Sequence, residues 1–190
     1  MDKKEVILQV TLDMIKEEGF DKITIRKIAK AARVNIAMIN YYFGSKENLM
    51  SQAIAVILEN IKDAFKLLDE TQKPPVIRLR GFLTQYAITC LQNPGAFRQF
   101  IQRGIFDYDS QKDFFLFLKS FGFHKVMDVI GEITGETDEE RQIMIMLQIM
   151  GGIIFPTVMI TPISLIMEFD VKNIEQKVEP YLEILLNKYI

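Results

Sequence analysis

Apolar residues recur along most of this 190-residue chain at intervals of three and four, the spacing of one face of an α-helix. Prolines, glycines and short polar stretches separate the periodic segments. The pattern predicts an all-α fold of about nine helices. The expected helices cover residues 2–18, 25–32, 36–43, 46–68, 75–91, 96–106, 111–133, 137–155 and 171–188.

The second and third expected helices are short and close together. The first of the pair places its apolar residues on one face, and the second is only about two turns long, so it needs packing against a neighbour. Thr24 and Asn35 precede the two helices and are expected to cap them. We expect Val34, Ile39 and Phe43 to face the first helix. The opposite face of the second helix would then present Ile36, Ala37, Asn40 and Tyr41 to solvent or to a partner.

The charge pattern around this pair favours a nucleic-acid partner. From Lys22 to Lys46 the chain has six basic residues and no acidic one. Basic side chains suit DNA phosphates, and a short helix with a polar face suits the major groove. The alternative is that these charges only solvate one face of a helical corner that serves as scaffold.

The segment from Gly19 to Met50 resembles the DNA-binding region of the TetR (tetracycline-repressor-like) family of bacterial transcription regulators. Capping, apolar and aromatic positions match without a gap. The matching residues are Gly19-Phe20, Thr24-Ile25-Arg26, Ile28-Ala29, Ala32, Val34, Ile39-Asn40-Tyr41-Tyr42-Phe43, Ser45-Lys46-Glu47 and Leu49. The resemblance covers about a quarter of the chain and implies a repressor that binds a palindromic DNA operator as a homodimer.

The resemblance also implies a role for individual residues. The expected phosphate contacts are Thr24, Arg33, Tyr42 and Lys46, and the residues expected to face the groove are Asn35, Ile36, Ala37, Asn40 and Tyr41. Arg33 occupies a turn position that is usually Gly in the family, where a side chain costs about 1 kcal/mol. Either the turn differs here, or Arg33 accepts the strain and gains a phosphate contact. Asn40, often aromatic in the family, has an amide able to read an adenine edge.

We expect a DNA-binding domain over residues 1–46 and a helical effector-binding and dimerisation domain over residues 47–190. Residues 1–50 hold nine basic and seven acidic residues, whereas the whole chain has a net charge of −2. A basic head on an acidic body would orient the molecule toward DNA. By the family resemblance, roughly residues 137–155 and 171–188 pair with a second copy in a four-helix bundle.

A long uncharged run extends from Ile143 to Met167. Its length raises the question of a membrane span. Gly151-Gly152, Pro156 and Pro162 interrupt the run, and no basic flank frames it. Burial against a second copy therefore explains the run better than a membrane does. No signal peptide is visible at the start, so we expect a cytoplasmic protein.

Fourteen Phe and ten Met favour an apolar pocket for a small-molecule effector of unknown identity. The candidate lining residues are Tyr86, Phe97, Phe100, Phe117, Phe121 and His124, although any one of them is more simply explained as core. The single Cys90 is expected to be a buried free thiol.

We expect no metal, cofactor or enzymatic activity, because no catalytic set, metal-ligand spacing or phosphate-binding glycine loop is visible. The alternative function is a helical small-molecule binding protein whose two-helix corner is only scaffold.

Overall fold

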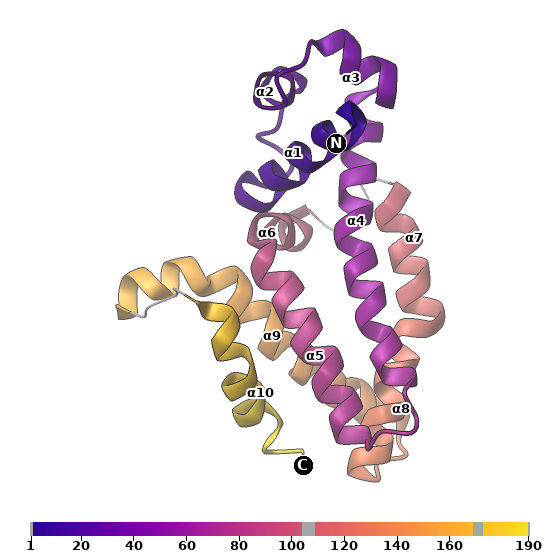
Figure 1. The fold of residues 1–190 in the computed structure, drawn as a ribbon. Helices are drawn as coiled ribbons and strands as arrows, with labels where there is room; N and C mark the ends of the chain where they lie inside the picture. The colour runs from indigo at the N-terminus through magenta and orange to yellow at the C-terminus, as the bar shows by residue number, and fades with distance from the viewer. Residues whose placement is uncertain (1, 104–108, 169–172, 190) are drawn as a thin grey trace. The chain divides into compact units, whose positions relative to one another are not determined.

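The computed structural model describes residues 2–103, 109–168 and 173–189, and these residues form helices connected by turns and short loops (Figure 1). The all-α expectation is confirmed for the described part of the chain. The α-helices are α1 (Lys3–Glu18), α2 (Ile25–Ala31), α3 (Ile36–Phe43), α4 (Lys46–Lys66), α5 (Pro75–Gln92), α6 (Pro94–Arg103), α7 (Asp109–Phe117), α8 (Phe123–Thr134), α9 (Glu139–Met167) and α10 (Val178–Leu186). Three short helical segments of other types are η1 (Leu67–Asp69), η2 (Leu118–Gly122) and η3 (Ile174–Lys177).

The chain groups into two compact units. The first comprises residues 1–59 and 93–116, and the second comprises residues 60–92 and 117–190. The expected DNA-binding segment lies wholly in the first unit, which also includes most of α4 and all of α6. Contacts remote in sequence place α6 in the first unit, because α6 packs against α1.

In the first unit α1 packs against α2, α3 and α6. The approach of α6 is close at Gly95, where an added Cβ would lie 2.7 Å from the backbone nitrogen of Gly19 and 2.9 Å from the carbonyl oxygen of Ile15. Only a glycine fits at this crossing without movement of the backbone. Ile7, Ile15 and Ile39 are fully buried in the unit.

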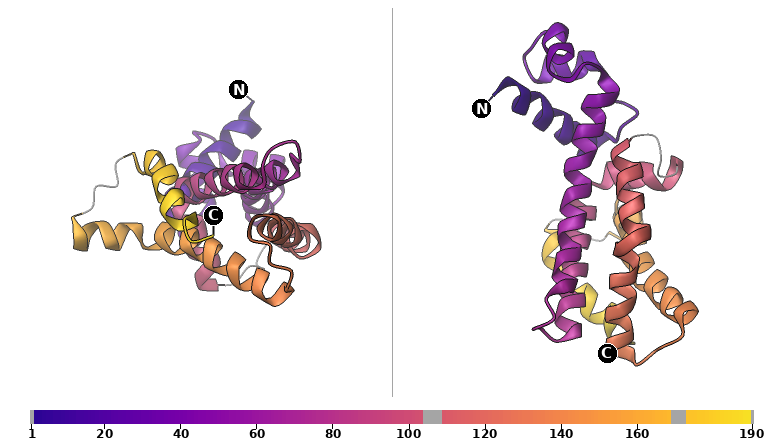
Figure 2. Two further views of the ribbon diagram at one scale, coloured as in Figure 1. Left: turned by 90° about the horizontal axis from the view of Figure 1, so that it is seen from below. Right: turned by 90° about the vertical axis from the view of Figure 1, so that its right-hand side faces the viewer.

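In the second unit α5 is central and packs against α8, α9 and α10. Figure 2 shows α9 and α10 close together at one side of this group. Phe65 at the end of α4 contacts Phe82 of α5, with ring centroids 4.7 Å apart. The buried guanidinium of Arg78 donates to the carbonyl oxygen of Leu68 at 2.9 Å and also pairs with Glu132. These contacts join the α4–α5 connection to α8.

The expected continuous helix over residues 111–133 is wrong in two details. It begins at Asp109, which the sequence assigned to a loop. It also contains a π-helical turn, η2, between α7 and α8. A π turn adds one residue to the helix and so rotates the following residues relative to an α-helix. Gly122 consequently faces inward, with an added Cβ placed 3.1 Å from the ring of Phe65.

The helix α9 begins at Glu139, later than the expected residue 137. Asp138 is the N-cap, and its carboxylate accepts from the backbone N–H of Arg141 at 2.9 Å. Glu136 accepts from the backbone N–H groups of Thr137 and Asp138, each at 3.0 Å. These two bonds lower the pKa of the Glu136 carboxyl, the bond from Asp138 most.

The helix α9 continues past residue 155, although Pro156 lies in its interior. A proline has no N–H to give to the carbonyl four residues earlier, which is that of Gly152. The hydroxyl of Tyr181 in α10 donates to this carbonyl instead. Gly152 also allows α10 to approach closely, because a Cβ added at Gly152 would lie 2.8 Å from the side chain of Leu185. A tertiary contact thus satisfies the acceptor that the proline leaves.

The last helix begins later than residue 171, at Val178, with Pro180 in its first turn and η3 before it. Pro is tolerated there because the first N–H groups of a helix have no partner within the helix. Residues 171 and 172 lie outside the described part of the chain.

Candidate nucleic-acid interface

Side-chain caps define both short helices of the first unit. The hydroxyl of Thr24 accepts from the backbone N–H of Lys27 at 3.2 Å at the start of α2. The side chain of Asn35 accepts from the backbone N–H of Met38 at 2.7 Å at the start of α3. Both caps predicted from the sequence are confirmed, and each satisfies one N–H that lacks a partner within its helix.

The turn between the two helices is a Schellman motif. The backbone N–H of Val34 donates to the carbonyl of Ala29 at 3.0 Å, and the N–H of Arg33 donates to the carbonyl of Lys30 at 3.3 Å. Arg33 itself has φ 53°, in the left-handed region. Arg33 therefore accepts the backbone strain named in the second alternative for this position.

The faces of α3 divide as the sequence predicts. Ile39 and Phe43 are buried and Val34 is half-buried. Residues on the opposite face are open to solvent, and the most exposed is Tyr41, at 82%. The ring of Tyr41 contacts that of Tyr42 edge-on at 5.2 Å. The exposed set consists of Asn35, Ile36, Ala37, Asn40 and Tyr41.

The remaining predicted DNA contacts lie around α3. Thr24 and Arg33 are exposed, whereas Tyr42 and Lys46 are half-buried. Lys27 was part of the basic run, but it pairs with Glu18 at 2.9 Å, an acid just outside that run. The sequence pattern did not reveal this pairing because it joins α2 to the end of α1.

The connection from α3 to α4 is short and closely hydrogen-bonded. Gly44 has φ 74° and donates its N–H to the carbonyl of Asn40 at 2.8 Å. The hydroxyl of Ser45 caps α4 by accepting from the backbone N–H of Asn48 at 3.1 Å. The side chain of Asn48 makes a further bond to α3, which the sequence reading missed because no local motif marks it.

The six predicted effector-pocket residues have different surroundings. Tyr86 is buried in the second unit, where it stacks on Phe82 at 5.9 Å and hydrogen-bonds to Cys90. Phe97 is buried in the first unit, and the side chain of Phe100 lies outside the described residues. Burial raises the pKa of both the Tyr86 hydroxyl and the Cys90 thiol, in accord with the predicted buried free cysteine.

The other three candidates lie around the π turn. Phe117 is half-buried and contacts the ring of Phe65 edge-on at 5.2 Å. Phe121 is 61% exposed and His124 is also exposed, which does not agree with an enclosed pocket position. The π turn explains this difference, because it brings Gly122 rather than Phe121 to the inner face.

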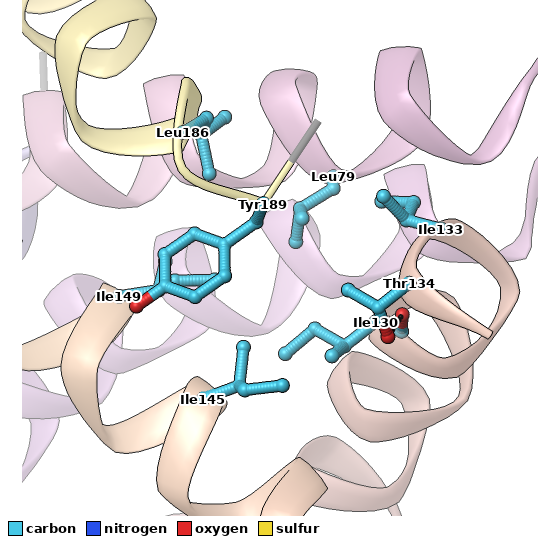
Figure 3. Close-up of a pocket in the computed structure, with 8 residues that line it drawn as sticks. All are labelled: Leu79, Ile130, Ile133, Thr134, Ile145, Ile149, Leu186 and Tyr189. Atoms are coloured by element: carbon cyan, nitrogen blue, oxygen red, sulfur yellow. Dashed lines mark hydrogen bonds between the residues drawn. The ribbon is translucent and has the colours of Figure 1, made fainter. Parts of the chain in front are cut away.

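A small apolar cavity in the second unit has a different lining (Figure 3). Its volume is about 10 Å³, room for roughly one water molecule. It is lined by Leu79, Ile130, Ile133, Thr134, Ile145, Ile149, Leu186 and Tyr189. None of the six predicted pocket residues is among them. Within the described part of the chain, no group of three or more His, Cys, Asp and Glu residues is placed to hold a metal ion.

The long helix α9 has two apolar faces. Met146, Ile149 and Ile153 are buried in the second unit. On another face Met144, Leu147 and Phe155 are 51%, 61% and 62% exposed. By length and composition, its stretch Glu139–Ile160 is able to cross a membrane, a test that core helices of soluble proteins also pass.

Comparison with known proteins agrees with this architecture. Residues 7–53 match the family described as "Bacterial regulatory proteins, tetR family". The chain is 37% identical over 62 residues to the HTH-type transcriptional regulator BetI 1 of Chromohalobacter salexigens, covering 33% of this chain and 31% of that protein. It is 36% identical over 56 residues to the probable HTH-type transcriptional regulator YttP of Bacillus subtilis, covering 30% and 27%. The match thus spans about a third of the length of these curated relatives.

Solved structures extend the likeness over most of the chain. A crystal structure of a HlyIIR mutant protein, with one segment replaced by a linker, has a TM-score of 0.63 and 25% identity, covering 81% of this chain and 85% of that one. A TetR transcription regulator from Haloarcula marismortui has a TM-score of 0.64 and 19% identity, covering 99% and 96%, and shows the shared fold. Residues 7–53, which include the capped two-helix corner, thus match the tetR family of bacterial regulatory proteins, and the helical body shares the fold of solved TetR regulators.

Proposed function

We propose that this protein is a transcription regulator, most simply a repressor, that binds a palindromic operator in double-stranded DNA. The main support for this proposal is the position of α3. Its outer face is open to solvent, while its caps and the Schellman turn before it hold it on the first unit. A helix presented in this way fits the major groove, with Asn40 and Tyr41 on the face toward the bases.

The proposal includes a homodimer. A single short helix reads few base pairs, and each mismatch costs only about 1–3 kcal/mol. Two copies related by a two-fold axis double the contacts and read a palindrome. The exposed apolar residues of α9, together with Ile184 of α10 at 77% exposure, support pairing through roughly residues 137–155 and 171–188. Pairing there also explains the apolar helix without a membrane, in keeping with a cytoplasmic protein.

A small apolar or amphipathic effector completes the proposal. Such a ligand releases DNA only if it binds better to the form of the dimer whose two DNA-binding regions do not match the spacing of the half-sites. A coupling free energy of about 1–3 kcal/mol lowers the affinity for DNA by about 5–150-fold. We place the effector site in the second unit, where two of the predicted lining residues, Tyr86 and Phe117, lie in a cluster of aromatic rings with Phe65 and Phe82.

The deciding experiment is selection of bound fragments from random and genomic DNA by the full chain. We expect a palindrome with two half-sites about one helical turn apart. Failure to retain any duplex at low salt, together with retention of apolar small molecules, would favour the helical binding protein with a scaffold corner.

The phosphate contact proposed for Lys46 makes a separate prediction. Lys46→Ala should weaken binding to the selected duplex and reduce the slope of log K against log salt by about one unit, because one fewer counterion is released. The measurement is fluorescence anisotropy over a salt series. Lys66→Ala, at the other end of α4 and paired with Asp63, is the matched control and should leave the slope unchanged. An unaltered slope in Lys46→Ala would remove Lys46 from the interface.

A further inference from the structure

The two ends of α3 are held differently. Its start carries the Asn35 cap, and its inner face is held by Ile39 and Phe43. At its end, the carbonyl oxygen of Phe43 accepts from the backbone N–H of Ser45 at 2.9 Å. The same oxygen accepts from the side-chain amide of Asn48, in the first turn of α4, at 2.8 Å.

This use of Asn48 differs from an ordinary capping box. In that motif the third residue of the helix carries Glu or Gln, whose side chain accepts from the backbone N–H of the N-cap. Here the N–H of the N-cap, Ser45, is already given to Phe43. Asn48 therefore acts as a donor, a role that a carboxylate cannot perform.

The side chain of Asn48 is not needed to begin α4. Ser45 caps that helix by accepting from the backbone N–H of Asn48, and the N–H of Leu49 donates to the carbonyl of Ser45 at 3.2 Å. Neither bond involves the side-chain amide of Asn48. The amide bonds to α3 instead, and its oxygen accepts from Gln52 one turn further along α4 at 3.4 Å.

We propose that Asn48 is a positioning residue for DNA recognition, which holds the end of α3 against the first turn of α4 and so sets the angle at which α3 enters the groove. This inference rests on the proposed function. An eight-residue helix has few contacts that fix its tilt, and a small misplacement separates side chains from base edges more than from phosphates. Asn48 therefore acts on specific binding, through α3.

The test measures the specificity ratio of the full chain, which is its affinity for the selected palindrome divided by its affinity for a scrambled duplex of equal length. Asn48→Ala should lower this ratio by about 2- to 10-fold, the range for one hydrogen bond, with unchanged affinity for the scrambled duplex and an unchanged salt slope. Asn48→Asp keeps the size of the side chain but lacks the donor, and it should lower the ratio similarly. Gln52→Ala removes the neighbouring bond and should leave the ratio unchanged.

The alternatives give different results. Equal losses on both duplexes with a salt slope lower by about one would identify Asn48 as a phosphate contact and overturn the inference. Equal losses with a lowered thermal midpoint would indicate a general stability role and also overturn it. An unchanged specificity ratio in both Asn48→Ala and Asn48→Asp would also overturn the inference. If the wild-type chain retains no duplex, the proposed function itself fails. This result is distinct from failure of the Asn48 inference, because the wild type alone shows it.

Discussion

Arg33 shows how one residue combines a backbone cost with a charge. At φ 53° its Cβ crowds the backbone, a conformation that glycine adopts freely. The Schellman bonds of Val34 and of Arg33 itself hold the arginine there. Retaining a basic side chain at a position suited to glycine is consistent with a contact to phosphate.

Substitution at Arg33 should separate these two effects. Arg33→Gly should raise the free energy of unfolding by up to about 1 kcal/mol, because the strain is relieved, and should weaken DNA binding, because a charge is lost. Arg33→Ala loses the same charge but keeps the strain, so its DNA affinity should fall equally without the gain in stability. Urea unfolding and anisotropy measure the two quantities. A destabilised Arg33→Gly protein would contradict the strained turn.

Cys90 makes a prediction about alkaline pH. Its thiol is fully buried, and burial raises its pKa well above the ordinary value of about 8.5. Above that pH the unfolded chain loses the proton while the folded chain keeps it, so stability falls as pH rises. Between pH 7 and pH 9.5 one such group should cost about 1 kcal/mol of stability. Urea unfolding of the wild type and of Cys90→Ala, at equal protein concentration, should differ in pH dependence by this amount; equal pH profiles would show that the thiol ionises in the folded state.

At the scale of elements, η2 determines which residues of the α7–α8 segment face inward. The π turn places Gly122 against Phe65, with the Phe117 ring and Leu118 on either side. A Cβ there would meet two aromatic rings and a leucine at 3.1–3.3 Å, tighter than ordinary van der Waals contact. The contact between this segment and the end of α4 therefore depends on the absence of a side chain.

Replacement of this glycine tests the close approach. Gly122→Ala should lower the thermal midpoint, with a loss of about 1–3 kcal/mol, because the neighbouring aromatic groups must move. Gly81→Ala in α5 is the matched control, since its added Cβ would lie 3.6 Å from Leu67, an ordinary contact. That control should be neutral or slightly stabilising, because alanine favours a helix. Equal midpoints for the two variants would mean that Gly122 has more room than the structure shows.

At the scale of the whole molecule, the proposed function depends on a second copy of the chain. Met144, Leu147 and Phe155 form an exposed apolar stripe on one face of α9, and contiguous exposed apolar residues often mark an interaction site. Leu147→Glu places a charge in the middle of that stripe and should weaken self-association by at least about 30-fold, since a buried unpaired charge costs several kcal/mol. Analytical ultracentrifugation measures the change. Gln72→Glu adds the same charge in an exposed turn and should associate as the wild type does. A stable dimer of Leu147→Glu would exclude this face.

The local sequence was sufficient for the helix-turn-helix corner. Thr24 and Asn35 cap helices through bonds to residues three positions later, and Ile39 and Phe43 face inward by helical period alone. Interactions of this range do not depend on the rest of the fold, so spacing along the chain predicts them. The exposed position of Asn40 and Tyr41 follows from the same period.

Only the tertiary structure decided features that depend on partners far along the chain. Continuation of α9 past Pro156 depends on a hydroxyl from Tyr181, 29 residues from the carbonyl that it satisfies. The inward turn of Gly122, rather than Phe121, depends on the rings that surround it. The hydrogen bond from the Asn48 side chain to Phe43 depends on how α3 meets α4. Periodicity describes one helix at a time, whereas these features arise where two helices meet, and packing overrides the local preference there.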